Sequence, residues 1–382
     1  MNMPRNLFHR LRPPLNRRVL IGGLLAAAAS AVATGGPPVG VAGTAGPAVP
    51  TQQSAAPLTE LKVIERVTTA TDRALDYLEQ KQIKDGAEAG SWSTNQALNA
   101  LAMLAFMSKG HVPGRGKYGD AIEGGVVKPG VLTRAKKYML AKARPTGYIS
   151  SSSMYEHGLA TLALAEMYGM DPDPDLEAKL RKAVDLIIKT QSPKGGWRYQ
   201  PSPTDQDMSV TVMQIVALRA ANNAEIPVPK RTFDKAIKYV RSCGAPTGGY
   251  GYQRPSAGPQ TSAAGALSLQ LLGKPDDPNI PKTMSYLTTI PVQWGGGNPQ
   301  YFYYFHYYAI QAFYQAGGNS WNVWHPRVRE LLLDKQNKDG SWDVPPGSAE
   351  ASLVTANSKI YSTAMATLIL NIYMHYLPAY QR

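Results

Sequence analysis

Two aspartates separated by one residue, Asp205 and Asp207, are the side chains of this sequence best suited to acid–base chemistry. Carboxyl groups at this spacing can share a proton, which raises the pKa of one of them. A buried acid of that kind can protonate an alkene or an epoxide, so we take both aspartates as candidate catalytic residues. The alternative is structural: Asp207 or Ser209 caps a helix that begins near Val210, because Asp and Ser are favoured N-cap residues.

A second group of side chains could surround a ligand. A histidine beside a carboxylate, as in Glu156-His157, can act as a general base or form structural hydrogen bonds only. The aromatic run 301–308 contains His306 and offers rings that stabilise a carbocation, stack on a sugar or fill a wide core. We expect the ligand-binding rim to comprise Glu156, His157, Tyr303, Tyr304, His306 and Tyr361.

Several chemistries are excluded by what the sequence lacks. Its single cysteine, Cys243, rules out a disulfide framework and a thiolate cluster. It contains no phosphate-binding glycine loop, dinucleotide fingerprint, His-Glu-x-x-His or Gly-x-Ser-x-Gly motif, so we predict no cofactor and no metal site. The net charge is +13, but five arginines lie in residues 1–18 and the other +8 forms no basic run. We therefore expect no nucleic-acid partner.

The elements that position these residues are repeated. A glycine–aromatic turn recurs about every 50 residues between the first and the last tryptophan of the series, a period typical of repeat architectures. The six turns contain Gly90-Ser91-Trp92, Gly147-Tyr148, Gly196-Trp197, Gly249-Tyr250, Trp294-Gly295 and Gly340-Ser341-Trp342.

Each turn separates two helical segments of different character. The segment before it is amphipathic, as in 176–190, where apolar residues recur every three or four positions. The segment after it, as in 210–221, is apolar on nearly all sides and must be buried. Six alternations predict an all-α, six-hairpin α/α toroid over residues 58–382, with an inner and an outer helix ring. An open α-solenoid is the alternative. In a toroid the six turns meet at one mouth, together with helix N-termini suited to an anionic head with an apolar tail.

The repeats resemble a known superfamily. The segments 191–197 and 336–342 are similar to the Q…G-x-W repeat of the prenyltransferase/squalene-cyclase (terpenoid cyclase) superfamily, and 205–214, 303–308 and 359–364 resemble its exported bacterial members. The resemblance implies a toroid and places Asp207 at the acid position of the class II cyclase Asp-x-Asp-Asp motif, although Met208 replaces the last aspartate. Zinc prenyltransferases have Asp-x-Cys here, and Ser209 stands where the cysteine would be, which argues against that activity.

The first 57 residues have a different composition. A basic stretch 1–18 and an apolar stretch 19–33 ending in Ala31-Val32-Ala33 predict a signal peptide over 1–33, or an uncleaved anchor. Arg17-Arg18 is compatible with the twin-arginine route as well as the Sec route. Residues 34–57 are rich in Gly, Pro and Ala and predict a disordered linker. We therefore expect export to the periplasm or cell envelope, with membrane association only through an uncleaved N-terminus.

These patterns favour one function and leave two alternatives. The favoured one is an exported, terpenoid-cyclase-like repeat protein whose central cavity binds an apolar or polyprenyl-type molecule, with catalysis left open. The alternatives are a non-catalytic cell-envelope scaffold with a protein partner, and a glycan-active toroid, since six-hairpin barrels also house carboxylate-pair glycosidases.

Overall fold

The computed structural model describes residues 60–372 except 151 and 298. The predicted signal peptide and linker lie outside these residues. Within them, no helix combines the length and the apolar character that a membrane crossing requires.

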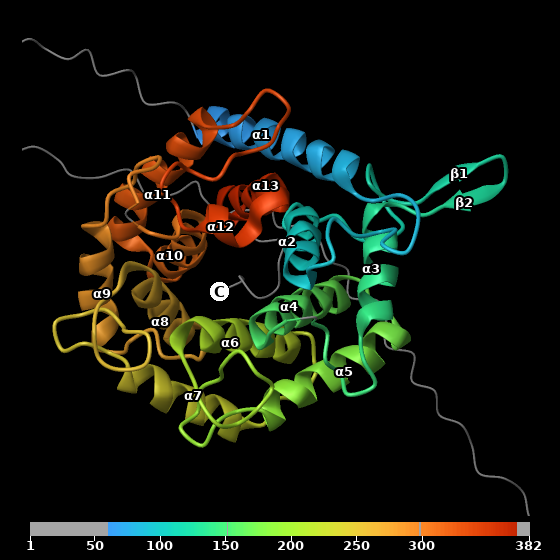
Figure 1. Ribbon diagram of the computed structural model, residues 1–382. Helices are drawn as coiled ribbons and strands as arrows, with labels where there is room; N and C mark the ends of the chain where they lie inside the picture. The colour runs from blue at the N-terminus through green and yellow to red at the C-terminus, as the bar shows by residue number, and fades with distance from the viewer. Residues whose placement is uncertain (1–59, 151, 298, 373–382) are drawn as a thin grey trace, which may run out of the picture. The chain divides into compact units, whose positions relative to one another are not determined.

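Twelve helices of the described residues form two concentric rings, which confirms the predicted toroid (Figure 1). The outer ring consists of α1 (Glu60–Lys81), α3 (Val131–Lys142), α5 (Pro174–Lys189), α7 (Lys230–Ser242), α9 (Asn279–Thr288) and α11 (Gly318–Asp334). The inner ring consists of α2 (Gln96–Met107), α4 (Met154–Met170), α6 (Met208–Asn223), α8 (Pro259–Leu271), α10 (Phe302–Ala316) and α13 (Ser358–Leu370). Because α13 contacts both α1 and α2, the ring is closed and the open solenoid is excluded.

Burial explains why each segment joins its ring. In the outer helix α5, Leu176, Leu180 and Ile187 are buried, and the charged residues between them lie toward solvent. Nearly every side chain of the inner helix α6 is buried. Burying one Leu or Ile side chain contributes about 1.5–3 kcal/mol, so six inner helices without a charged face strongly favour closure.

The glycine–aromatic turns join neighbouring hairpins. Gly195 has φ +104°, and a Cβ there would lie 2.1 Å from the carbonyl oxygen of Lys235 in α7, so only glycine fits. Trp197 Nε1 donates to the carbonyl of Ile187 (2.7 Å), and Gln191 Nε2 bridges this turn to the start of α7. The same hydrogen bonds recur with Gln82 and Trp92, and with Gln336 and Trp342. These tryptophans are structural.

Two connections depart from the simple repeat. A hairpin of β1 (Ala121–Glu123) and β2 (Val126–Lys128) projects between α2 and α3 and was not anticipated, because three-residue strands leave no readable alternation. Its turn uses Gly124 and Gly125, both at positive φ. The connection from α11 to α13 contains α12 (Glu350–Val354) and the short helix η1 (Thr355–Asn357), which bring Glu350 to the inner ring.

Candidate functional site

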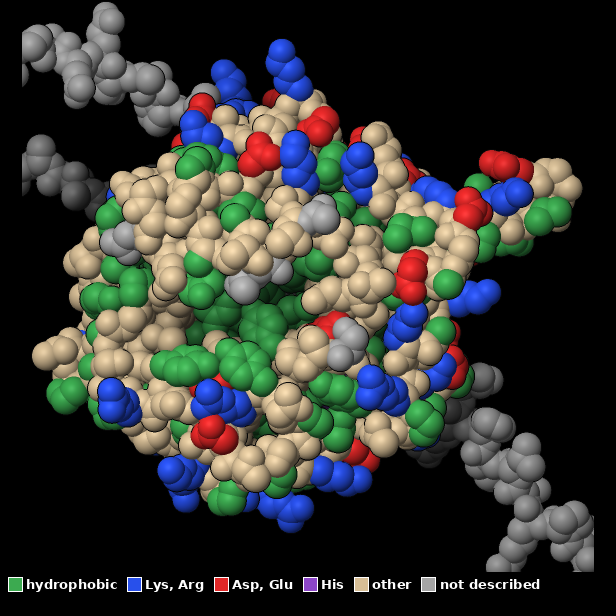
Figure 2. Space-filling model, in the orientation of Figure 1, with side chains coloured by type: hydrophobic (Ala, Val, Ile, Leu, Met, Phe, Trp, Pro, Cys, Tyr) green, Lys and Arg blue, Asp and Glu red, His purple; other side chains and the backbone are tan. Residues whose placement is uncertain are grey.

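A cavity of about 600 Å³ lies where the inner helices begin. Figure 2 shows this mouth as a hollow lined with hydrophobic side chains. Seven tyrosines line it: Tyr155, Tyr199, Tyr252, Tyr301, Tyr304, Tyr307 and Tyr361. The apolar wall is formed by Ala97, Leu98, Leu101, Leu159, Met213, Val354 and Met365. The polar lining residues are Asn95, Ser209, Gln260, Thr261 and Glu350.

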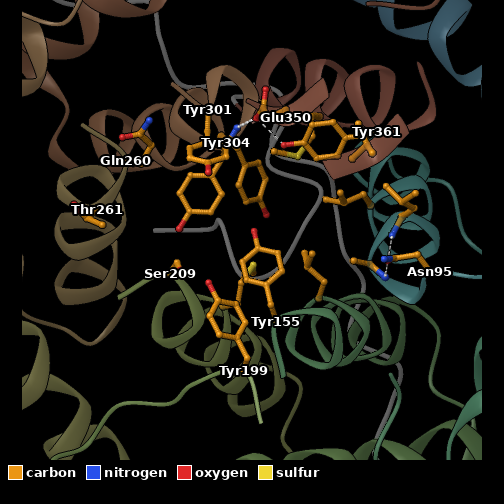
Figure 3. A pocket seen from close by; sticks show the side chains of 18 of the residues that line it. Asn95, Tyr155, Tyr199, Ser209, Gln260, Thr261, Tyr301, Tyr304, Glu350 and Tyr361 are labelled. Atoms are coloured by element: carbon orange, nitrogen blue, oxygen red, sulfur yellow. Dashed lines mark hydrogen bonds between the residues drawn. The ribbon is translucent and has the colours of Figure 1, made fainter. Parts of the chain in front are cut away.

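The tyrosines approach this space from several helices (Figure 3). The ring of Tyr155 on α4 is stacked toward that of Tyr304 on α10, with 6.4 Å between ring centroids. At the outer edge the hydroxyls of Tyr199 and Tyr252 lie 3.2 Å apart. Burial raises the pKa values of Tyr155 and Tyr304, so both phenols are neutral at physiological pH. The tyrosines therefore offer ring faces and hydroxyls without adding charge.

Glu350 is the ionisable acid of the lining, and sequence reasoning missed it. Its side chain is buried, and Oε1 accepts from the backbone N–H of Tyr304 (2.8 Å) and the hydroxyl of Tyr361 (2.8 Å). Oε2 accepts from the N–H of Tyr303 (3.1 Å) and the hydroxyl of Ser348 (3.0 Å). Burial raises the pKa of Glu350 above its usual value despite these hydrogen bonds. The carboxylate thus closes the N-terminus of α10 and faces the cavity.

The two candidate catalytic aspartates lie beside the mouth. Asp207 is fully buried and caps α6, because its Oδ1 accepts from the N–H of Val210 (2.9 Å) and the hydroxyl of Ser209 (2.6 Å). Its Oδ2 has no hydrogen-bond partner and lies 3.8 Å from Arg198 Nε. Asp205 is half exposed and binds Arg198 at 2.6 Å. Neither aspartate lines the cavity, whereas Ser209 does. The structural role expected for Asp207 is present, and its catalytic role stays a prediction.

The predicted rim residues separate into two groups. Tyr304 and Tyr361 line the cavity. His157 instead lies between α4 and α5, where Nδ1 faces the N–H of Ile149 (3.1 Å) and Nε2 faces the carbonyl of Ala183 (3.2 Å). His306 is buried against Trp324 of α11, with 5.5 Å between ring centroids. Burial lowers the pKa of both histidines to about 4, so both are neutral. Their placement on the rim is corrected: both lie between the rings.

Tyr303 and Glu156 also lie behind the lining. The hydroxyl of Tyr303 donates to the carbonyl of Asp343 (2.9 Å), away from the cavity. Glu156 Oε1 accepts from the N–H of Gln96 (2.5 Å), so it closes the N-terminus of α2. Both side chains were expected at the rim, and both instead connect neighbouring repeats.

The expected anion site at the helix N-termini is largely occupied by the protein itself. Side chains cap the first turns of four inner helices: Asn95 and Glu156 on α2, Ser153 on α4, Asp207 on α6 and Glu350 on α10. The expectation of an anionic head is therefore corrected for these four helices. Among residues 60–372, apart from 151 and 298, no three His, Cys, Asp or Glu side chains gather as metal ligands.

Comparison with solved structures identifies the fold. The type II terpene cyclase MstE from Scytonema, in complex with its substrate geranylgeranyl dihydroxybenzoate, is similar with TM-score 0.54 and 14% identity, over 81% of this chain and 98% of the cyclase. The likeness shows that this chain and the cyclase share the α/α toroid fold. An inactive variant of the GH76A α-1,6-mannanase of Salegentibacter sp. HEL1_6, in complex with α-1,6-mannotriose, is similar with TM-score 0.56 and 9% identity, over 80% of this chain and 98% of the mannanase.

The toroid likeness extends to the architecture and no further. No protein-family model and no curated protein sequence matches the chain. The fold predicted from the Q…G-x-W repeats is confirmed, and the neighbours include both a terpenoid and a glycan enzyme. Function must therefore be inferred from the cavity itself.

Proposed function

We propose that the toroid binds an apolar, isoprenoid-type small molecule in the cavity at its mouth. The observation that carries this proposal is a space of about 600 Å³ walled by aliphatic side chains and tyrosine rings, with one carboxylate at its edge. Small-molecule sites typically have volumes of roughly 300–1,000 Å³ and a mostly apolar lining with few polar groups. Export to the periplasm or cell envelope stays part of the proposal.

The terpene cyclase neighbour supports the isoprenoid class. Crystal complexes of MstE variants hold geranylgeranyl dihydroxybenzoate as substrate and merosterolic acid A as product. If this toroid also turns its ligand over, Asp207 is the predicted acid, because it is buried with one oxygen free of hydrogen bonds. Glu350 is the second candidate acid, since it lines the cavity and burial raises its pKa.

A glycan is the second candidate ligand. The mannanase neighbour binds α-1,6-mannotriose, and exposed tyrosines such as Tyr199 and Tyr252 can stack on sugar rings. Glycosidases, however, use two carboxyl groups on either side of the scissile bond. Among the described residues of this lining Glu350 is the single carboxylate, so the cavity favours the isoprenoid.

Two ligands and two variants test the proposal on the full chain. Geranylgeraniol and α-1,6-mannotriose are titrated by calorimetry and by quenching of intrinsic fluorescence. Ala97 lines the cavity at the start of α2, so the indole of Ala97→Trp should obstruct it and abolish geranylgeraniol binding. Ala178 is exposed on the outer helix α5, so Ala178→Trp is the matched control and should bind normally.

Each result decides between the candidates. Saturable binding of geranylgeraniol that only Ala97→Trp removes supports the proposal. Binding of mannotriose alone supports the glycan candidate. Binding of neither, together with a partner chain retained in native mass spectrometry, supports the scaffold alternative.

A further inference from the structure

We infer that the cavity selects a ligand with a quaternary ammonium head over an anionic one. This inference rests on the proposed function and names the charge class of its ligand. Four observations carry it: the charges of the lining, the saturated hydrogen bonding of Glu350, the occupied helix N-termini and the tyrosine rings.

The lining is acidic. Among the described residues that line the cavity, Glu350 is a carboxylate and none is Lys, Arg or His. The neighbouring Arg198 is shared by two carboxylates, since it lies 2.6 Å from Asp205 and 3.8 Å from Asp207. On the other side, Lys359 is paired with Asp343 at 3.5 Å. These two basic groups beside the mouth are therefore each paired with at least one acid.

The helix beneath Glu350 does not cancel its charge. A helix N-terminus carries about half a unit of positive charge, and the carboxylate carries a full negative one. When Glu350 is ionised, the α10 terminus therefore leaves a net negative site at the wall of the cavity. Such a field attracts cations and repels anions more strongly than the same charge in water.

The carboxylate has no lone pair to spare for a ligand N–H. A carboxylate accepts about four hydrogen bonds, and Glu350 already accepts four, from Tyr303, Tyr304, Tyr361 and Ser348. A primary ammonium brings three donors that require acceptors, and Glu350 has none left to offer, so such a head would depend on the hydroxyl and amide oxygens of the lining. A quaternary ammonium has no N–H donor and is attracted by the negative charge of Glu350 without a hydrogen bond. This head group therefore fits the site best.

The tyrosine rings suit the same head. Tyr155 and Tyr304 approach one another across the cavity, and Tyr361 lies beside Glu350 with its hydroxyl bound to it. Quaternary ammonium ions bind well against aromatic faces because the ring quadrupole is negative there. Four of the six inner-helix N-termini, those of α2, α4, α6 and α10, are capped by side chains, whereas those of α8 and α13 carry no side-chain cap. The tyrosine rings thus favour the cation independently of Glu350.

Three probes with one chain and different heads test the inference. They are N,N,N-trimethylgeranylgeranylammonium, geranylgeraniol and geranylgeranyl phosphate, titrated against the full chain by calorimetry below their aggregation concentrations. We expect the cation to bind about tenfold more tightly than the alcohol, and the phosphate more weakly than both. The primary amine of the same chain should bind more weakly than its trimethylated form.

Two variants separate a local effect from the overall charge. Glu350→Gln should lower the affinity for the trimethylammonium probe about tenfold relative to the affinity for geranylgeraniol in the same variant. Glu123→Gln, on the projecting hairpin, removes the same charge far along the surface and should change neither affinity. If Glu350→Gln does not fold, the ranking of the three probes in the unmodified chain still decides the question.

The outcomes distinguish this inference from the proposed function. Geranylgeranyl phosphate binding as tightly as the cation would overturn the inference and leave the proposed isoprenoid site standing. Failure of all three probes to bind would overturn both.

Discussion

Glu156 and Glu350 stand on two sides of the mouth and make the same kind of contact. Each carboxylate comes from one repeat and accepts a backbone N–H from the first turn of an inner helix in the preceding repeat. Glu156 binds the N–H of Gln96 in α2, and Glu350 binds the N–H groups of Tyr303 and Tyr304 in α10. Both therefore connect adjacent hairpins of the ring.

Their surroundings give these two acids opposite electrostatics. Burial alone would raise the pKa of Glu156, but hydrogen bonds from Ser150, Gln96 and Ser152 together lower it. At Glu350 burial prevails, and the pKa is raised. Both carboxylates accept several hydrogen bonds, but Glu350 also faces a cavity of rings and aliphatic side chains, and burial outweighs its hydrogen bonds. The same kind of contact thus yields a stabilising anion at one position and a cavity-facing anion at the other.

The largest difference between the two glutamates should appear in the stability of variants that remove each charge. Glu156→Gln should lower the free energy of unfolding by about 3 kcal/mol, because the amide nitrogen meets N–H and O–H donors in place of a carboxylate oxygen. Urea unfolding of both glutamine variants checks this value. A loss at Glu156 no larger than that at Glu350 would contradict the comparison.

Buried histidines also make the free energy of unfolding depend on pH. Their contribution must be separated from that of the two glutamates. His157 has a folded pKa of about 4 against an ordinary value of 6.5. Below pH 6.5 the unfolded chain binds a proton that the folded chain rejects, so stability falls as the pH drops toward 4. We expect the free energy of unfolding of His157→Gln to fall by about 2–3 kcal/mol less than that of the unmodified protein over this pH range. Unfolding curves at pH 7 and pH 4.5 measure it, and parallel losses in both proteins would refute the assignment.

Opposite pH profiles should distinguish the two glutamates themselves. A lowered pKa makes the ionised Glu156 stabilising above its ordinary pKa of 4.5, and this contribution is lost as the pH falls further. A raised pKa makes the ionised Glu350 less favourable, so Glu350→Gln should lose less free energy of unfolding at pH 7 than Glu156→Gln, although its amide nitrogen also meets donors. Relative to this variant, the unmodified protein should become more stable as the pH falls through the Glu350 pKa. If lowering the pH changed the stability of the unmodified protein in the same direction relative to both glutamine variants, the contrast between the two glutamates would be contradicted.

The smallest effect is expected at Asp207. Asparagine is as good an N-cap as aspartate, so Asp207→Asn should change the free energy of unfolding by less than about 0.5 kcal/mol. The same variant tests the predicted acid, because turnover of an isoprenoid substrate would then be lost without loss of stability. Turnover that persists in Asp207→Asn and vanishes in Glu350→Gln would move the acid to Glu350.

The ring was predictable from the sequence, because six pairs of amphipathic and apolar segments have few other ways to bury their surfaces. The site was predictable only in part. Neighbouring residues on a helix differ by about 100° in direction, so Tyr304 lines the cavity while Tyr303 bonds to Asp343 behind it. Glu350 lies in a five-residue helix inside an irregular connection, where no periodic pattern indicates which side chain is buried.

Binding of geranylgeraniol to the unmodified chain and to Ala97→Trp tests the central claim most directly. The indole of Ala97→Trp in the cavity should abolish saturable geranylgeraniol binding. The control Ala178→Trp should bind geranylgeraniol as the unmodified chain does. Equal binding by all three proteins, or binding by none of them, would show that the space between the tyrosines is not a ligand site.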